Sequence, residues 1–310
     1  MKWRPIVGLG AALMILGAVG CRPRPVPTRP TGTVRVLCAT YPVWLMTRSV
    51  TDGRSSVQTE RLFAADLGCA HEHVMAPQDA RRLASADVLI VNGLGLDDYA
   101  SAAYRRVRPN GTIIVASRDV DRSLHRGGSS ARQTSANPHL FASPWRYAAM
   151  ARSVAASLGR YDPGGAAMYQ RNARSLARRL EGLGDDFRTK LASMPNRRII
   201  TDHDVFDYLA DDAGIEVAAV VRADPESDPG PSELIEIVRR AQRLHPAALF
   251  VEPGSGSRLG QTIAAEIGIP LAILDPVVQG PEDPEPDYYE RAMRRNLRTL
   301  VHVLGRSGKP

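Results

Sequence analysis

Three histidines and one aspartate each stand at or just beyond the end of a strand-like run, two of them in each half of the chain. They are His71, His139, His203 and Asp275. In open parallel sheets, ligands bind beyond the carboxyl ends of the strands. Two such sheets facing each other would therefore bring three imidazoles and one carboxylate to a single point between two lobes. Three nitrogens and one oxygen are the ligands of a transition-metal site, and zinc is the ion they suit best.

Strand-like and helix-like segments alternate twice over along the chain, once in each half. The strands are expected at 33–40, 57–63, 87–93 and 112–117, and then at 197–203, 217–221, 247–253 and 270–276. Such alternation predicts parallel sheets with helices on both faces. The expected fold class is therefore α/β, with two lobes, each a parallel sheet flanked by helices, and a metal site in the cleft between them.

Between the two halves, a segment from Pro163 to about Met194 has the pattern of one long helix. Apolar residues recur there at spacings of three and four, namely Leu176, Leu180, Leu183, Phe187, Leu191 and Met194. This is the stripe of a helix that packs along one face. At 1.5 Å per residue it would run about 45 Å and could brace both lobes. Gly182 and Gly184 weaken it by roughly 1 kcal/mol each relative to alanine, so a bend is allowed there.

The amino terminus has the features of a bacterial export signal. Lys2 and Arg4 precede fifteen apolar or glycine residues at 6–20, fewer than the roughly 20 that span a bilayer. Cys21 follows small residues and resembles the lipidated cysteine of a lipobox, although Ala18 stands where leucine is usual. An ordinary secretory signal or an uncleaved anchor is the alternative. The proline-rich stretch at 22–33 would remain extended as a tether.

The predicted organisation follows from these segments. It comprises a signal peptide at 1–20, a lipidated cysteine with its tether at 21–32, an N-terminal lobe at 33–160, a bridging helix at 161–194 and a C-terminal lobe at 195–310. The net charge of +7 falls to +5 without the first 20 residues, and the arginines are scattered along helices. No basic run interleaved with aromatic residues argues for nucleic acid. We expect a monomer.

At this point a resemblance to a known family becomes specific. The segment GCAHEHVMAPQDARRLASADVLIVNGLGLDDY at 68–99 resembles the first metal motif of the zinc/manganese solute-binding proteins of bacterial ABC transporters, the TroA-like family. NPHLFASP at 137–144 is similar to the second motif, and TDHDVFDYLADDAGIE at 201–216 to the third. LFVEPGSGS at 249–257 with LAILDP at 271–276 resembles the fourth. The resemblance covers nearly the whole mature chain.

The resemblance implies that His71, His139, His203 and Asp275 are the metal ligands, and that a long helix joins two α/β lobes. It also implies an extracytoplasmic receptor, anchored by lipid to a bacterial membrane, that delivers the ion to an ABC permease and its ATPase. Histidine at the third position is more frequent in the zinc carriers, and imidazole nitrogen also suits zinc. Mn²⁺ or Fe²⁺ is the alternative metal, because the order of affinities alone excludes neither. A long histidine-rich loop is absent, since 121–136 offers only His125.

Three further residues are candidates to support the ligands from outside the metal's own coordination shell. They are His73, which stands where the family commonly has tyrosine, Asp204 and Glu252. A carboxylate can orient an imidazole by accepting a hydrogen bond from it. An exposed carboxylate is the equally simple interpretation of Asp204.

Cys38 and Cys69 fall near the ends of the first two expected strands. An extracytoplasmic location permits a disulfide between them. Two free buried thiols are the alternative, and a Cys69 thiolate in the metal site is a third interpretation.

Other classes of function fit the sequence less well. A zinc hydrolase keeps an open coordination position for water, whereas four protein ligands fill the coordination shell of zinc. We therefore expect that the protein is not an enzyme. GLGLDDY lacks the spacing of a phosphate loop. An adhesin that uses the same fold is a further alternative.

Overall fold

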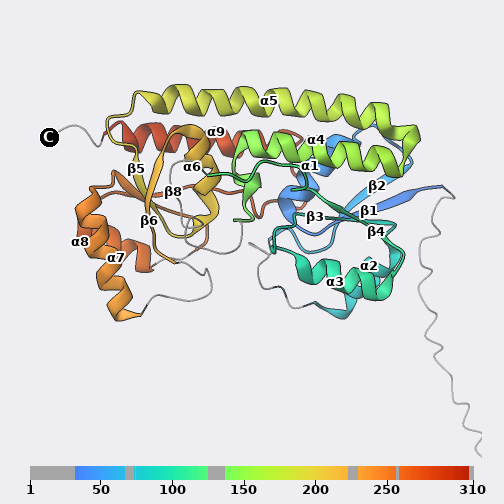
Figure 1. The fold of residues 1–310 in the computed structure, drawn as a ribbon, viewed down its shortest axis with the longest axis horizontal. Helices are drawn as coiled ribbons and strands as arrows, with labels where there is room; N and C mark the ends of the chain where they lie inside the picture. Colours follow the sequence, from blue (N-terminus) through green and yellow to red (C-terminus); the bar gives the residue numbers. More distant parts are fainter. Residues whose placement is uncertain are drawn as a thin grey trace, which may run out of the picture. The chain divides into compact units, whose positions relative to one another are not determined.

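Two four-stranded sheets form the framework of the structure (Figure 1). The computed structural model describes residues 32–66, 73, 75–124, 137–222, 230–255 and 258–306, with only the backbone of 231 and 233. The first sheet has the order β2-β1-β3-β4 and the second the order β6-β5-β7-β8. Their strands are β1 Val34–Cys38, β2 Val57–Arg61, β3 Val88–Val91, β4 Thr112–Val115, β5 Arg198–Thr201, β6 Glu216–Val220, β7 Ala248–Val251 and β8 Leu271–Ile273. All neighbouring strands are parallel, which confirms the predicted α/β class.

Helices cover the sheets and connect their strands. They are α1 Tyr41–Thr51, α2 Pro77–Ser85, α3 Asp98–Val107, α4 Pro144–Tyr161, α5 Ala166–Ala192, α6 Asp207–Ala213, α7 Pro231–Leu244, α8 Arg258–Ile267 and α9 Tyr288–Leu304, with the 3₁₀ turns η2 Leu140–Ala142, η3 Pro163–Gly165 and η4 Asp204–Phe206. Three α-helices begin at a proline, whose fixed φ suits the first helical position. Among the described helices, none combines the length and the apolar character needed to cross a lipid bilayer.

The long helix α5 is the element common to both lobes, where each lobe is one sheet with its own helices. It extends over 27 residues, about 40 Å, and runs unbroken through Gly182 and Gly184. The two glycines have different surroundings. A Cβ on Gly184 would lie 2.4 Å from the ring of Trp145 on α4, whereas one on Gly182 would meet no atom of the described residues within 4 Å. Gly184 therefore lets α4 and α5 approach closely.

A single large apolar core extends through both lobes. In the central strand β3, Val88 and Ile90 belong to this core, while Leu89 and Val91 face a smaller core beneath α2 and α3. The central strand β7 divides in the same way. Its residues Ala248 and Phe250 join the large core, and Leu249 and Val251 face α7 and α8.

This alternation places both sheets against the same layer of helices, in which α5 and α9 lie side by side (Figure 1). Because that layer contributes to one continuous core, separating the lobes would expose apolar surface from both sheets.

A second connection, which the sequence pattern did not predict, follows β8. The chain returns to the first lobe, where Gly280 N donates to Ala65 O (3.0 Å) and Tyr41 Oη donates to Pro281 O (3.0 Å). The chain then enters α9, and Tyr289 at its start stacks on Tyr147 of α4 with ring centroids 4.1 Å apart. The lobes are therefore joined by α5 and by this return segment.

The predicted signal peptide, Cys21 and the greater part of the tether lie outside the described residues. They stay predictions.

The two glycines of α5 provide a matched test of this packing. Gly184→Ala should lower the free energy of unfolding by about 1–3 kcal/mol, because the added methyl group forces Trp145 to move. Gly182→Ala should raise it by about 0.5–1 kcal/mol, because alanine loses less backbone entropy in a helix and nothing obstructs its methyl group. Urea denaturation measures both. Stabilisation by both substitutions would contradict the close approach of α4 to α5.

Candidate metal centre

His139 reaches the lobe boundary because its segment is fixed to the end of β3. Asn92, fully buried just after that strand, donates from Nδ2 to Pro138 O (2.9 Å). The buried Asp97 carboxylate in turn accepts from the backbone N–H of Asn92 (2.6 Å) and of Gly93 (2.9 Å). This arrangement gives the Asn-Gly segment at 92–93 a structural role. It anchors the segment that carries His139.

His203 comes from the second lobe, two residues beyond the end of β5 and directly before η4. Its ring lies against that of His139, with centroids 4.8 Å apart and planes at 83°. Both side chains are almost completely buried, with residue exposures of 1% for His139 and 3% for His203. The structure therefore brings these two imidazoles together, one from each lobe. That they bind a metal stays a prediction.

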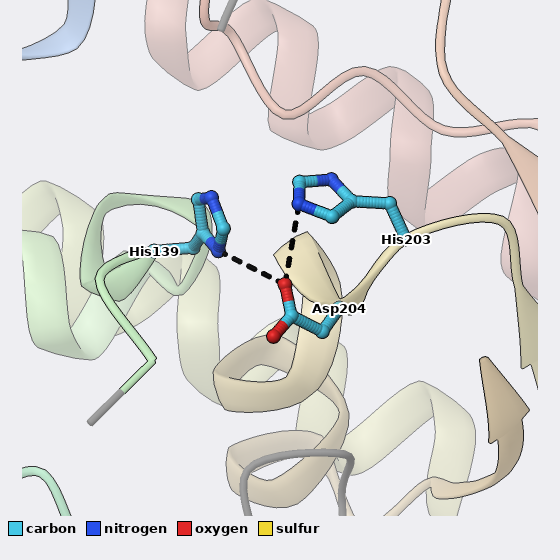
Figure 2. Close-up of side chains that lie close together, drawn as sticks. All are labelled: His139, His203 and Asp204. Atoms are coloured by element: carbon cyan, nitrogen blue, oxygen red, sulfur yellow. Dashed lines mark ion pairs between the residues drawn. The ribbon is translucent and has the colours of Figure 1, made fainter. Parts of the chain in front are cut away.

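A carboxylate lies beside the two rings. Asp204 Oδ1 is 3.4 Å from His139 Nδ1 and 3.2 Å from His203 Nε2, and Figure 2 shows both rings close to it. Among the described residues, these three form the one group whose potential ligand atoms gather closely enough for a metal ion, all within 4.8 Å of one another. The exposed-carboxylate interpretation of Asp204 is wrong, because its residue exposure is 6%.

Each imidazole has a hydrogen-bond partner at Nδ1. Asn137 Oδ1 lies 2.8 Å from His139 Nδ1, and Glu252 Oε1 lies 3.0 Å from His203 Nδ1. When Nδ1–H donates to such an acceptor, the proton is held there and Nε2 is left as the metal-binding atom. Asn137 was not among the candidates from sequence, although it precedes His139 by two residues in the NPH motif.

The two histidines have opposite electrostatic environments. Burial lowers the pKa of His139 below its ordinary value, and the neighbouring Asp204 does not compensate. Burial alone would also lower the pKa of His203, but the hydrogen bond and charge of Glu252, with the charge of Asp204, outweigh it and raise that pKa. Without metal, His203 is therefore the histidine that holds a proton to higher pH.

Asp275 occupies a different position from Asp204. Its Oδ1 accepts from Val277 N (2.8 Å), its Oδ2 lies 3.7 Å from Arg295 Nη2, and burial raises its pKa. It is not part of the group of three. Val277 has a φ of +63°, which is rare for a β-branched residue and costs of order 1–3 kcal/mol. The turn that carries Asp275 is therefore held in a strained conformation.

Two other predicted residues, His73 and Cys38, are not part of the group formed by His139, His203 and Asp204. His73 Nε2 lies 3.3 Å from Asp79 Oδ2 at the start of α2, and its ring packs on Phe63 at 3.9 Å between centroids. Cys38 is fully buried, and burial raises the pKa of its thiol to about 12. Cys69 and His71 lie outside the described residues, so the disulfide and the fourth ligand stay predictions.

Comparisons with known proteins agree on one family. The family model of the periplasmic zinc-uptake complex component A, ZnuA, matches residues 36–303. The high-affinity zinc uptake system protein ZnuA of Bacillus subtilis is 21% identical, over 98% of this chain and 98% of the relative. The iron ABC transporter substrate-binding lipoprotein MtsA of Streptococcus pyogenes is 22% identical, over 85% of this chain and 86% of the relative. The structure of FpvC from Pseudomonas aeruginosa in complex with Mn²⁺ is similar with a TM-score of 0.78 and 30% identity, covering 89% of this chain and 100% of that one.

The contact between Glu252 and His203 predicts a pH-dependent stability of the metal-free protein. Because the pKa of His203 is raised in the folded state, the contact stabilises fully below the unfolded value of about 6.5 and is lost as pH rises through the folded pKa. Glu252→Gln should therefore lower the melting temperature more at pH 6 than at pH 8. It should also lower the pKa of His203 in an NMR titration.

Glu216→Gln is the control, because Glu216 forms an exposed ion pair with Arg198 on the second sheet, and no histidine is its partner in the described part of the chain. Equal losses of melting temperature at both pH values in Glu252→Gln would contradict the proposed coupling.

Proposed function

The chain belongs to the family of periplasmic zinc-uptake component A proteins, and on this premise we propose that it is an extracytoplasmic receptor that binds zinc and passes it to an ABC importer. One observation carries the proposal. Two buried imidazoles, one from each lobe, meet beside a buried carboxylate, and each has a hydrogen-bond acceptor at Nδ1. Imidazoles oriented by outer acceptors are the usual construction of a protein metal site.

The donor atoms suit zinc. Zinc is typically held by four ligands in a tetrahedron, and imidazole nitrogens are among its preferred donors. Burial favours the neutral form of His139, which is the form that binds a metal. Manganese or iron is the alternative cargo, since manganese prefers a more oxygen-rich shell and Asp204, Asp275 and Glu252 offer such oxygens.

We assign the ligands as His71, His139, His203 and Asp275. In this assignment Asn137 and Glu252 orient the two described imidazoles. Asp204 is the competing carboxylate, since its Oδ1 lies 3.2 Å from His203 Nε2, the nitrogen left free for a metal. Its 3.4 Å approach to His139 is to Nδ1, the nitrogen that also contacts Asn137. Substitution of each aspartate distinguishes the two possibilities.

Four protein ligands leave no coordination position for an attacking water, which favours a receptor over a hydrolase. Family membership implies a permease and an ATPase as partners. Since each lobe supplies part of the site, metal binding favours the arrangement in which the lobes lie together. Release would then require the importer to separate ligands that the bound ion holds together.

Lipidation of Cys21 would keep the receptor at the membrane that holds its importer. This part of the proposal rests on the basic start of the chain, the apolar stretch at 6–20 and the small residues before Cys21. The relative MtsA is itself named a lipoprotein.

Zinc should bind at one high-affinity site. At 100–1,000 times the dissociation constant, zinc should stabilise the protein by about 2.7–4.1 kcal/mol and raise its melting temperature. His71→Ala, His139→Ala and His203→Ala should each weaken binding by more than the roughly 10–100-fold that loss of an outer partner costs. Asp275→Ala should weaken it less if water fills the vacant position. Asp204→Ala should weaken it less than Asp275→Ala if Asp275 is the ligand.

Competition with a chromogenic chelator at pH 7 measures these affinities. His302→Ala is the control, because His302 is an exposed histidine in the last turn of α9 and is not one of the four assigned ligands. Unchanged zinc affinity in both His71→Ala and His203→Ala would defeat the interlobe site. If manganese bound more tightly than zinc, the assignment of zinc as the transported ion would be wrong.

The anchor has a separate test. The wild-type protein should partition into detergent, because the lipid on Cys21 adds a hydrocarbon chain. Cys21→Ser should release the protein into the aqueous phase or leave an unprocessed precursor. Phase partitioning and intact mass distinguish the forms, and identical results for both proteins would remove the lipid anchor from the proposal.

A further inference from the structure

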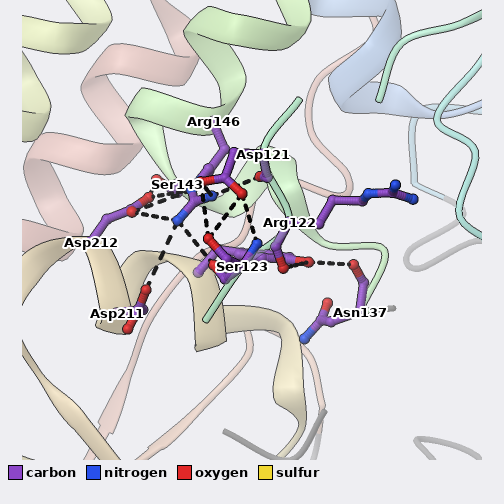
Figure 3. Close-up of polar contacts among 9 residues, drawn as sticks. Asp121, Arg122, Ser123, Asn137, Ser143, Arg146, Asp211 and Asp212 are labelled. Carbon is purple, nitrogen blue, oxygen red and sulfur yellow. Dashed lines mark hydrogen bonds and ion pairs between the residues drawn. The ribbon is translucent and has the colours of Figure 1, made fainter. Parts of the chain in front are cut away.

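A bidentate ion pair connects the two lobes through the helices that follow His139 and His203. Arg146 on α4 donates to Asp212 on α6 from Nε to Oδ2 (2.9 Å) and from Nη2 to Oδ1 (2.8 Å). Ser143, at the N-cap of α4, donates from Oγ to Asp212 Oδ2 (2.6 Å). Figure 3 shows the Arg146 side chain among the carboxylates of α6 and the chain segment at 121–123. One carboxylate of the second lobe thus accepts from two side chains of the first.

The Arg146 guanidinium has further contacts besides those with Asp212. Its Nη1 donates to Asp121 O (2.6 Å), and its guanidinium lies over the ring of Tyr208 at 5.4 Å. The residue is 7% exposed. A partly buried charge pair with bidentate geometry and further hydrogen bonds is a strong and directional contact.

The positions of these residues along the chain connect the ion pair to the two imidazoles. Arg146 follows His139 by seven residues through η2 and the first turn of α4, and Asp212 follows His203 by nine residues through η4 and α6. Both connections are short and helical. Fixing the start of α4 to α6 therefore restricts the separation of the segments that carry the two histidines.

Two more hydrogen bonds cross the lobe boundary at the same place. Asn137 Nδ2 donates to Asp204 O (2.8 Å), and Tyr208 Oη donates to Asn137 O (3.0 Å). Asn137 is also the acceptor for His139 Nδ1. The segment that carries His139 is consequently attached to the second lobe at both the loop before the histidine and the helix after it.

We propose that the Arg146–Asp212 ion pair is a positioning device that holds His139 and His203 as a preformed pair across the lobe boundary, so that it controls how long the metal stays bound. This inference rests on the proposed function, since it concerns the same metal. A preformed pair binds more tightly because its ordering is complete before the ion arrives. Weakening the ion pair should accordingly speed the loss of metal.

Asp212→Asn tests the proposal, because it retains the size of the side chain and removes its charge and one acceptor oxygen. Zinc affinity should fall about 10–100-fold, the effect of losing a contact that orients a ligand, with most of the change in a faster dissociation rate. Chelator competition gives the affinity, and stopped-flow mixing with excess chelator gives the rate. The visible absorption of the Co²⁺-substituted protein should also change, because it reports ligand geometry. Arg146→Lys retains the positive charge but cannot form the two parallel hydrogen bonds to the Asp212 carboxylate. It should therefore change all three measurements in the same direction.

The chain offers a closely matched control in Asp162→Asn. Asp162 accepts a bidentate fork from Arg54, at 3.1 and 3.0 Å, and a hydroxyl from Tyr169, at 2.5 Å. It therefore has the same kinds of partner as Asp212 without linking the two histidine segments. Asp162→Asn should lower the melting temperature and leave zinc affinity, dissociation rate and the Co²⁺ spectrum unchanged.

The outcomes separate this inference from the proposed function. If the wild type binds zinc tightly and Asp212→Asn matches it in affinity, rate and Co²⁺ spectrum, or if Asp162→Asn impairs binding equally, the positioning role is overturned. If the wild type binds no metal, the proposed function fails. Hydrogen–deuterium exchange of the metal-free protein then decides the ion pair's role. Segments 137–147 and 203–213 should exchange faster in Asp212→Asn than in the wild type, and unchanged exchange there would overturn it.

Discussion

The continuous apolar core along α5 is the constraint on which the rest of the structure depends. Alternate residues of the central strands β3 and β7 enter this one core from two different sheets. The lobes therefore cannot separate freely, because each would expose apolar surface that only the shared layer of helices covers. The close contact of Trp145 with Gly184 and the return segment ahead of α9 strengthen the same connection. The side chains that meet at the lobe boundary, His139 and His203 among them, are consequently held within a narrow range of separations.

Polar groups at that boundary are buried, and their mutual arrangement follows from the cost of burying them. An imidazole or carboxylate removed from water needs hydrogen-bond partners. His203 is hydrogen-bonded to Glu252, and His139 is hydrogen-bonded to Asn137. The Arg146 guanidinium likewise donates hydrogen bonds to the Asp212 carboxylate. The hydrogen bonds to the two histidines also restrict rotation of their rings. The same contacts that offset the cost of burying the imidazoles therefore orient their nitrogen atoms. Burial lowers the pKa of His139, and the charge of Glu252 raises that of His203, so the paired histidines differ in proton affinity.

Much of the fold could be predicted because it depends on local periodicity. The alternation of strands and helices indicated two parallel sheets, and the leucine spacing indicated α5. The return segment after β8 could not be predicted, because its contacts at Ala65 and Tyr41 join residues more than 200 positions apart. The two glycines of α5 looked alike in the sequence. They differ in their surroundings, because Trp145 packs against Gly184 whereas no described residue would lie within 4 Å of a Cβ on Gly182.

The sequence by itself determined the α/β class and singled out His139 and His203 as candidate ligands, since residue type and position after a strand depend only on nearby residues. The tertiary structure decided which groups surround these imidazoles. It placed Asp204 beside both rings, Asn137 and Glu252 at their Nδ1 atoms, and His73 against Phe63 and Asp79. The physical reason is that hydrogen bonds and pKa shifts act over a few ångströms in space. Residues from separate strands and lobes come within that range only when the chain has folded.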